Sequence, residues 1–114
     1  GRRLKLANQG KFGADFVFVR DVATALLKAI ESRFDGSLNV GSGERRTVAD
    51  VALTLCELMN VDSGKIDIDR TNDEDDMGFP ALDISRAREC LGLAPVQLRE
   101  GLAEVAKASR AALD

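Results

Sequence analysis

The sequence contains no His, no Tyr and no Trp among its 114 residues. The missing histidine removes the most common general base and the commonest metal ligand. Without an imidazole to activate them, Ser42 and Ser85 cannot act in a Ser–His nucleophile within this chain. We therefore predict no catalytic residue, no cofactor-binding residue and no metal site in this stretch.

Other features are scarce. The two cysteines, Cys56 and Cys90, form no CxxC pair, so we predict buried free thiols rather than a disulfide. No apolar run approaches the length of a membrane span, and no apolar signal segment follows the first residues. We expect a cytoplasmic protein with no membrane partner. Net charge is −3 without a basic cluster, which argues against nucleic-acid binding.

What the sequence does contain is enough apolar material for a core. Apolar residues make up 45% and charged residues 31%, as in a soluble globular domain. The length suits one domain over residues 1–114 or a piece of a larger protein. The abrupt start resembles a cut end, so we expect a domain fragment.

The first half predicts a strand–helix–strand unit. Residues 15–19 (DFVFV) are β-branched and aromatic, and residues 37–40 form a second strand-like stretch. Between them, Asp21 is a good N-cap for a helix over residues 22–32. Apolar residues surround most of this helix, which is typical of a helix packed on two sides. The pattern predicts a βαβ crossover with two adjacent parallel strands.

The second half predicts three more helices and a short strand. Asp50 lies three residues after Thr47, the pattern of a capping box. The expected elements are a helix from Thr47, a strand over residues 65–69, an acidic loop over 70–78, a helix ending near Leu91 before Gly92, and a helix over 98–113. The predicted fold class is α/β, with a small parallel βαβ unit and three to four packed helices.

A Gly-Ser-Gly turn at residues 41–43 joins the second predicted strand to the next helix. A dinucleotide-binding fingerprint needs the pattern GxGxxG. Gly41 and Gly43 fit it, but Arg46 stands at the position of the third glycine, and the lysine of a P-loop is missing. Two interpretations stay open: a tight strand-to-helix turn only, or a turn whose backbone also contacts a ligand held elsewhere. The acidic run 73–76 reads as a solvated loop rather than a metal site.

Three blocks of the sequence, taken in order, resemble one protein family. They are residues 15–25 (DFVFVRDVATA), 38–51 (LNVGSGERRTVADV) and 82–102 (LDISRARECLGLAPVQLREGL). In this order and spacing they resemble the C-terminal part of extended short-chain dehydrogenase/reductases. The closest resemblance is to nucleotide-sugar epimerases and 4,6-dehydratases, and it covers nearly all of residues 12–105.

The resemblance implies the substrate-binding, C-terminal lobe of a Rossmann-type epimerase. In that family the glycine-rich NAD(P) site and a Tyr-xxx-Lys pair lie upstream in a Rossmann domain, and neither motif occurs here. The expected cofactor is NAD or NADP bound by that domain, and the expected partner is a nucleotide sugar or related small molecule. The family pattern also allows a homodimer of the longer protein. The residues expected to bind substrate are Phe16, Asn39, Arg20, Arg45, Arg46 and Arg70.

The sequence departs from the family pattern where a diphosphate is usually bound. The family's arginine before Asp-Phe is Ala14 here, and the arginine of its R-P-G-D element falls on Asp73. Each lost charge-assisted contact is worth about 1.5–3 kcal/mol. Either another arginine takes over, or the ligand is not a typical nucleotide sugar. Two alternatives therefore stand beside the first hypothesis: a reductase of a non-nucleotide carbonyl compound, and a non-catalytic binding module.

Overall fold

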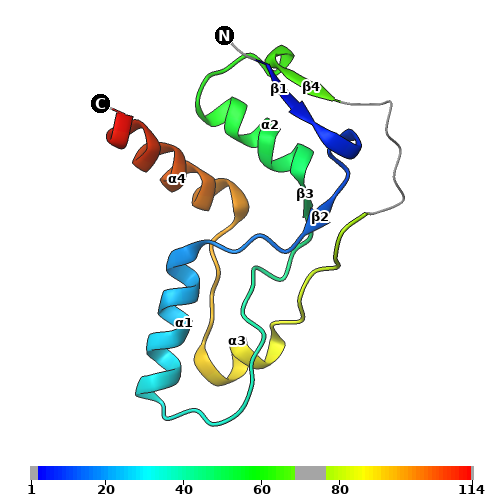
Figure 1. Cartoon of the computed structure of the whole chain (residues 1–114). Helices are drawn as coiled ribbons and strands as arrows, with labels where there is room; N and C mark the ends of the chain where they lie inside the picture. Colours follow the sequence, from blue (N-terminus) through cyan, green and yellow to red (C-terminus); the bar gives the residue numbers. More distant parts are fainter. Residues whose placement is uncertain (1–2, 69–76, 114) are drawn as a thin grey trace.

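The computed structural model describes residues 3–68 and 77–113 (Figure 1). Within these ranges the chain forms four α-helices, four short β-strands and two 3-10 turns. Their bounds are β1 Leu4–Leu6, β2 Gly13–Ala14, α1 Val19–Glu31, β3 Arg46–Thr47, α2 Val48–Leu58, β4 Ile66–Ile68, α3 Ser85–Leu91 and α4 Leu98–Leu113, with 3-10 turns at Ala7–Gly10 and Ser63–Lys65. The predicted α/β class with a small parallel sheet is confirmed.

The parallel pair, however, is not where the sequence pattern placed it. β1 pairs with β4 in parallel, Lys5 opposite Asp67, while β2 and β3 form an antiparallel pair. Residues 15–18 and 37–40 form no strand, so the predicted βαβ crossover over residues 15–40 was wrong. A strand needs a neighbour to complete its hydrogen-bond ladder, and the described residues provide none for either stretch.

Helix α1 begins at Val19, three residues earlier than predicted. Asp21 is not its N-cap; it lies in the first turn, where its Oδ2 accepts a hydrogen bond from the Val96 backbone N–H at 3.0 Å. A carboxylate in the first turn is favourable because the helix dipole is positive there. Asp21 therefore ties α1 to the segment that leads into α4.

Helix α2 has the predicted start. The Thr47 hydroxyl accepts from the Asp50 N–H at 3.1 Å, and the Asp50 carboxylate accepts from the Thr47 N–H at 2.9 Å. This confirms the capping box. The predicted strand near residues 65–69 and the last two helices are also confirmed. Helix α3 ends at Leu91, and Gly92 is its C-cap with a φ of 65°.

The molecule divides visibly into two groups of elements (Figure 1). One contains α2, α4 and the β1–β4 pair; the other contains α1 and α3. The main buried cluster joins α1 to α3 and the segment after it, and consists of Ala25, Ile84, Ala87, Leu91 and Leu93, with Leu38 and Val40 packed against it. This packing, rather than a ladder, holds the segment 37–40.

Two smaller points concern surface and thiols. Both cysteines are free as predicted, but Cys90 is exposed and Cys56 half-buried, so the prediction of buried thiols was wrong. Cys90 lies in α3, a short helix whose other side provides Ala87 and Leu91 to the core. Across the described ranges, no helix has the length and hydropathy needed to cross a membrane.

Candidate functional site

Asp15 is the centre of a junction between three loops. Its Oδ1 accepts from the backbone N–H of Ser42 at 2.7 Å and from the Ser42 hydroxyl at 2.7 Å. Its Oδ2 accepts from the N–H of Gly43 at 2.9 Å and of Leu82 at 3.1 Å. Four donors therefore converge on one carboxylate, and none of its partners lies within 26 residues of it in sequence.

The ionised form of Asp15 is favoured by this environment. Partial burial raises the pKa of the carboxyl group, but the hydrogen bonds from Ser42, Leu82 and Gly43 act in the opposite direction and prevail. The pKa of Asp15 therefore lies below its ordinary value of 3.8. The negative charge is half-buried and faces three backbone amides and the Ser42 hydroxyl.

This junction answers the question raised by the Gly-Ser-Gly turn. The backbone amides of Ser42 and Gly43, which could have held an anion, are both occupied by Asp15. Gly43 has a φ of 79°, which favours glycine. At Gly41, a Cβ would lie 2.9 Å from Asp15 Oδ2. The glycines thus allow the turn to close around a side chain of the same chain.

Arg45 lies next to the same junction, with its guanidinium against Gly13. Its Nε donates to the Phe79 carbonyl at 3.2 Å, and one terminal nitrogen donates to the Met77 carbonyl. A Cβ on Gly13 would be only 2.2 Å from Arg45 Cζ, so glycine makes this position accessible. The Gly13 backbone bonds to the same segment, donating to Met77 and accepting from Phe79.

The charge of Arg45 is not matched by a carboxylate within the described ranges. It donates to two backbone carbonyls, whereas Arg46 pairs with Glu44 and Arg99 with Glu57. A guanidinium has five N–H groups, so two such bonds leave donors for a further acceptor. Arg45 is half-buried, which strengthens its electrostatic interactions relative to a fully exposed arginine.

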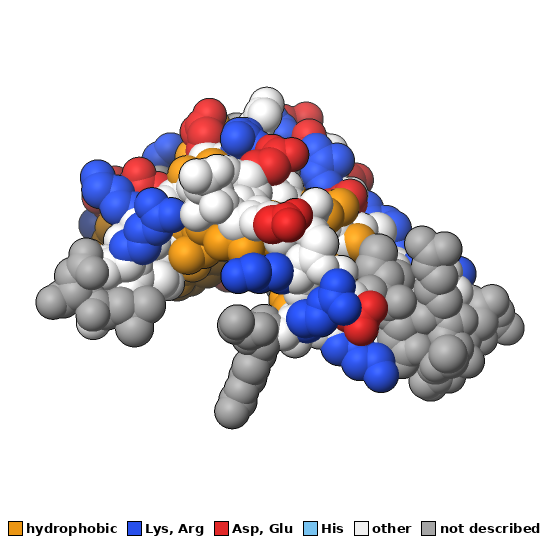
Figure 2. All heavy atoms as spheres, turned by 90° about the horizontal axis from the view of Figure 1, so that it is seen from above, with side chains coloured by type: hydrophobic (Ala, Val, Ile, Leu, Met, Phe, Trp, Pro, Cys, Tyr) orange, Lys and Arg blue, Asp and Glu red, His pale blue; other side chains and the backbone are white. Residues whose placement is uncertain are grey.

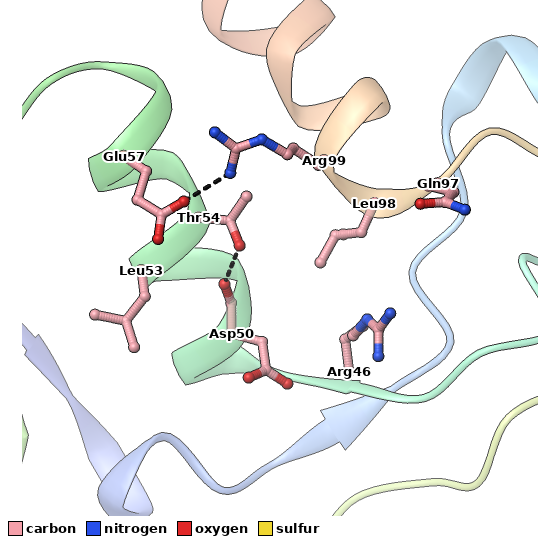
Figure 3. Close-up of a pocket in the computed structure, with 8 residues that line it drawn as sticks. All are labelled: Arg46, Asp50, Leu53, Thr54, Glu57, Gln97, Leu98 and Arg99. Carbon is pink, nitrogen blue, oxygen red and sulfur yellow. Dashed lines mark hydrogen bonds and ion pairs between the residues drawn. The ribbon is translucent and has the colours of Figure 1, made fainter.

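Arg46, the next residue in the sequence, lies in a different part of the molecule. It borders a polar cavity of about 350 Å³ between α2 and α4 (Figure 3). The cavity is lined by Arg46, Asp50, Leu53, Thr54, Glu57, Gln97, Leu98 and Arg99. Arg46 pairs with Glu44 at 2.8 Å and Arg99 with Glu57 at 2.6 Å, so an anion in this cavity would compete with carboxylates already present.

Phe16 and Arg20 lie on a third surface. Phe16 lines an apolar cavity of about 280 Å³ together with Phe18, Val51 and residues of α4. Arg20 is exposed, and its guanidinium carbon lies 5.3 Å from the centre of the Phe18 ring. This contact occupies one face of the guanidinium and directs it toward its own helix start.

The two remaining predicted residues are also separate. Asn39 is exposed; its Nδ2 donates to the Asp83 carbonyl at 3.3 Å, in a hollow beside α3. Arg70 and the acidic run 73–76 lie outside the described residues. The structure thus places Phe16, Asn39 and Arg46 in three different hollows. Arg45 lies apart from them against Gly13, so the four residues are not gathered into one site.

Sequence reasoning missed the most connected residue of the junction, Asp15. It was read as the first residue of a strand. Two features of the sequence could have indicated this role. Asp15 is a charged residue at the start of the apolar stretch 15–19, and Gly41 and Gly43 directly follow the second strand-like stretch, 37–40. Asp21 was also misassigned: it was predicted to be an N-cap, but it accepts a hydrogen bond from Val96.

The comparisons with known proteins agree with the resemblance. The chain is 33% identical over 103 residues to UDP-glucuronic acid decarboxylase 3 of Arabidopsis thaliana, covering 90% of this chain and 30% of that protein. UDP-glucuronic acid decarboxylase 4 of the same plant is 34% identical over 100 residues, with 22% of its length covered. No protein-family model matches the chain.

Solved structures agree with the sequence matches. A UDP-glucose 4-epimerase from Thermotoga maritima, solved with UDP-glucose, superposes with a TM-score of 0.79 and 30% identity, over 98% of this chain and 36% of that one. The enzyme WbmF of Bordetella bronchiseptica, solved with NAD+ and UDP, gives 0.78 and 28%, over 95% and 32%.

These matches confirm the resemblance to nucleotide-sugar epimerases and related enzymes of the extended short-chain dehydrogenase/reductase family. The chain spans between 22% and 36% of the length of these relatives. The three sequence blocks that carry the resemblance meet at one carboxylate: Asp15 from the first, Ser42 and Gly43 from the second, and Leu82 at the start of the third.

Proposed function

We propose that this chain is the substrate-binding part of an NAD(P)-dependent enzyme that acts on a nucleotide sugar. The observation that carries the proposal is the agreement of sequence and fold over at least 90% of the chain with proteins whose names specify UDP-sugars. Hydride transfer with NAD or NADP would be supplied by another part of a longer protein. This chain would position the sugar nucleotide, which is a large share of such catalysis.

Arg45 is the best candidate for binding the diphosphate of that substrate. The resemblance places the family's two arginines at Ala14 and at Asp73. Arg45, the residue before β3, extends to Gly13, the neighbour of Ala14 in sequence. It also donates to the carbonyls of Met77 and Phe79, which follow Asp73 by four and six residues. Its remaining N–H groups can donate to phosphate oxygens, and a guanidinium binds phosphate in a bidentate manner. Arg20 and Arg46, in contrast, already have a ring and a carboxylate as partners.

The first prediction concerns this residue. Arg45→Gln should weaken binding of UDP-glucose or UDP by about tenfold, because one charge-assisted contact is lost. Calorimetric titration of the protein at its natural length measures the affinity, and a thermal melt checks folding. Arg46→Gln is the matched control, since it removes the same charge one residue away and should leave the affinity nearly unchanged.

The result also decides between the hypotheses. Equal loss in the two variants would contradict the role of Arg45. If neither UDP nor a UDP-, dTDP- or GDP-sugar binds at millimolar concentration, the nucleotide-sugar proposal is wrong. Reduction of simple ketones with NADPH would then favour the alternative of a reductase that acts on a non-nucleotide carbonyl compound. Ala14, in place of the family's arginine, also favours this alternative.

A further inference from the structure

The Arg45 side chain crosses a strand to reach its acceptors. Arg45 directly precedes β3, and β3 pairs with one edge of β2 (Figure 1). At the other edge of β2, Gly13 donates to the Met77 carbonyl at 2.9 Å and accepts from the Phe79 N–H at 2.8 Å. Neighbouring strands are about 4.8 Å apart, so only a long side chain can reach carbonyls beyond the adjacent strand. The Arg45 side chain does so over Gly13.

Gly13 provides the space in which the guanidinium lies. Gly13 is buried, and a Cβ at this position would be 2.7 Å from Arg45 Nε and closer still to Cζ and one terminal nitrogen. The guanidinium therefore occupies the volume that a side chain at position 13 would fill. Gly13 is not among the glycines with positive φ, so its backbone conformation is open to other residues. The passage of Arg45 is thus the constraint that an alanine would violate.

Gly78, the bridge partner of Gly13, has a different constraint. Its φ is 85°, and a Cβ there would overlap the carbonyl oxygen of Gly13, which is a backbone atom. For Gly13, in contrast, the three nearest atoms all belong to the flexible end of Arg45. A side chain at position 78 would separate two backbone segments, whereas one at position 13 would displace only the guanidinium.

A guanidinium held in this way suits a phosphate group. The bonds to Met77 and Phe79 involve Nε and one terminal nitrogen, so N–H groups remain for a further acceptor. A group that is fixed before its ligand arrives loses less conformational entropy on binding. Figure 2 shows basic and acidic side chains interspersed over the face seen from above, without a broad basic patch there. On that face, recognition of an anion would have to depend on local groups.

We propose that Gly13 is a positioning residue that determines ligand specificity. Because it has no side chain, Arg45 is held against Gly13 and the carbonyls of Met77 and Phe79, where it binds a phosphate or diphosphate group. This inference rests on the proposed function and deepens it at the same site. A side chain at position 13 moves the guanidinium away from both carbonyls, and the chain then loses its preference for ligands that carry phosphate.

A double-mutant cycle with Arg45 tests this inference. Calorimetric titration with UDP compares the wild type, Gly13→Ala, Arg45→Gln and the double variant, all in the protein at its natural length. We expect Gly13→Ala to weaken UDP binding by about tenfold when Arg45 is present, and by less than about twofold in Arg45→Gln, which has no guanidinium to displace. A merely structural effect of the alanine would be equal in both backgrounds.

Gly64→Ala is the matched control. Gly64 also lacks a positive φ, and a Cβ there would meet side-chain atoms of Asp62, the nearest at 3.3 Å. This variant makes the same chemical change in the turn before β4 and should leave UDP affinity unchanged. Thermal melts of both alanine variants check folding.

A second readout needs no ligand. In Gly13→Ala the Arg45 Nε–H loses the Phe79 carbonyl, so its exchange with water should become at least about tenfold faster. NMR of the protein with isotope-labelled arginine measures this exchange. Arg45→Gln assigns the resonance, because it removes it.

Each result is decisive. Equal weakening in both backgrounds, unchanged UDP affinity of Gly13→Ala, or unchanged Nε–H exchange overturns the inference, while UDP binding by the wild type still supports the proposed function. Titration with inorganic pyrophosphate separates the two claims. If UDP does not bind but pyrophosphate shows the expected pattern across the four proteins, the proposed function is rejected and the inference is supported. If neither binds, both are wrong.

Discussion

At the scale of single residues, Asp15 has an unusual share of the contacts between distant segments. Both of its oxygens accept two hydrogen bonds, and all four donors belong to loops rather than to helices. A carboxylate with this many donors acts as an internal anion for the Gly-Ser-Gly turn. The turn that could have held a ligand phosphate is thereby converted into a structural element.

The second prediction replaces this carboxylate. Asp15→Asn should lower the free energy of unfolding by about 2–3 kcal/mol, because an amide group accepts with one oxygen only and directs its N–H₂ at backbone donors. Urea unfolding followed by circular dichroism measures the change. Asp35→Asn, an exposed loop residue, is the control and should change stability by less than about 0.5 kcal/mol.

The third prediction follows from the lowered pKa of Asp15. A group whose pKa is lower in the folded state stabilises the fold above its unfolded value and loses this effect as pH falls through the folded value. The stability difference between the wild type and Asp15→Asn should therefore be constant near neutral pH and shrink below about pH 4. Unfolding curves between pH 3 and 7 check this; a difference independent of pH would show that the charge contributes nothing.

At the scale of elements, α2 is specified locally and α1 is not. The signals that specify α2 all lie within its 11 residues and its N-cap. They are the capping box of Thr47 and Asp50 and the apolar stripe of the helix. Helix α1 lacks a side-chain cap and begins after Phe18 in extended backbone. Its first turn is instead joined to a distant segment, because Asp21 accepts a hydrogen bond from the Val96 N–H across 75 residues.

The fourth prediction concerns the cap of α2. Thr47→Ala should destabilise the protein by about 1 kcal/mol, because the Asp50 N–H loses its acceptor. Thr54→Ala makes the same chemical change inside the same helix, where the hydroxyl donates to the Asp50 carbonyl and is not required for the helix. Thermal or urea unfolding of both variants measures the contrast. Equal losses would mean that the cap has no special role.

At the scale of the whole molecule, the open shape is the main feature. Small-angle X-ray scattering of the 114-residue chain should give a radius of gyration near the 16.7 Å of the Cα atoms. A value near 13 Å, that of a compact domain, would mean that α1 folds back onto another element in solution. The measurement needs dilute samples, since the exposed apolar side chains of α1 (Val19, Leu26, Leu27 and Ile30) favour self-association at high concentration.

Prediction from sequence worked best where structure is determined by neighbours in the chain. The capping box at Thr47, the glycine stop at Gly92 and the helices over residues 85–91 and 98–113 all have local signals. It failed for the strands at residues 15–19 and 37–40. Their composition is that of strands, but a strand exists only beside a partner, and the described residues place none there.

The candidate site shows the same division. Sequence indicated the family and a set of arginines, but not that adjacent Arg45 and Arg46 serve different places, one beside Gly13 and one beside Glu44. By itself, the sequence determined where helices form, the start of α2, the end of α3 and the family resemblance, because these depend on short-range periodicity and ordered blocks. Only the tertiary structure decided that Asp15 joins those blocks and that one side of α1 stays uncovered, because both depend on which distant segments come into contact.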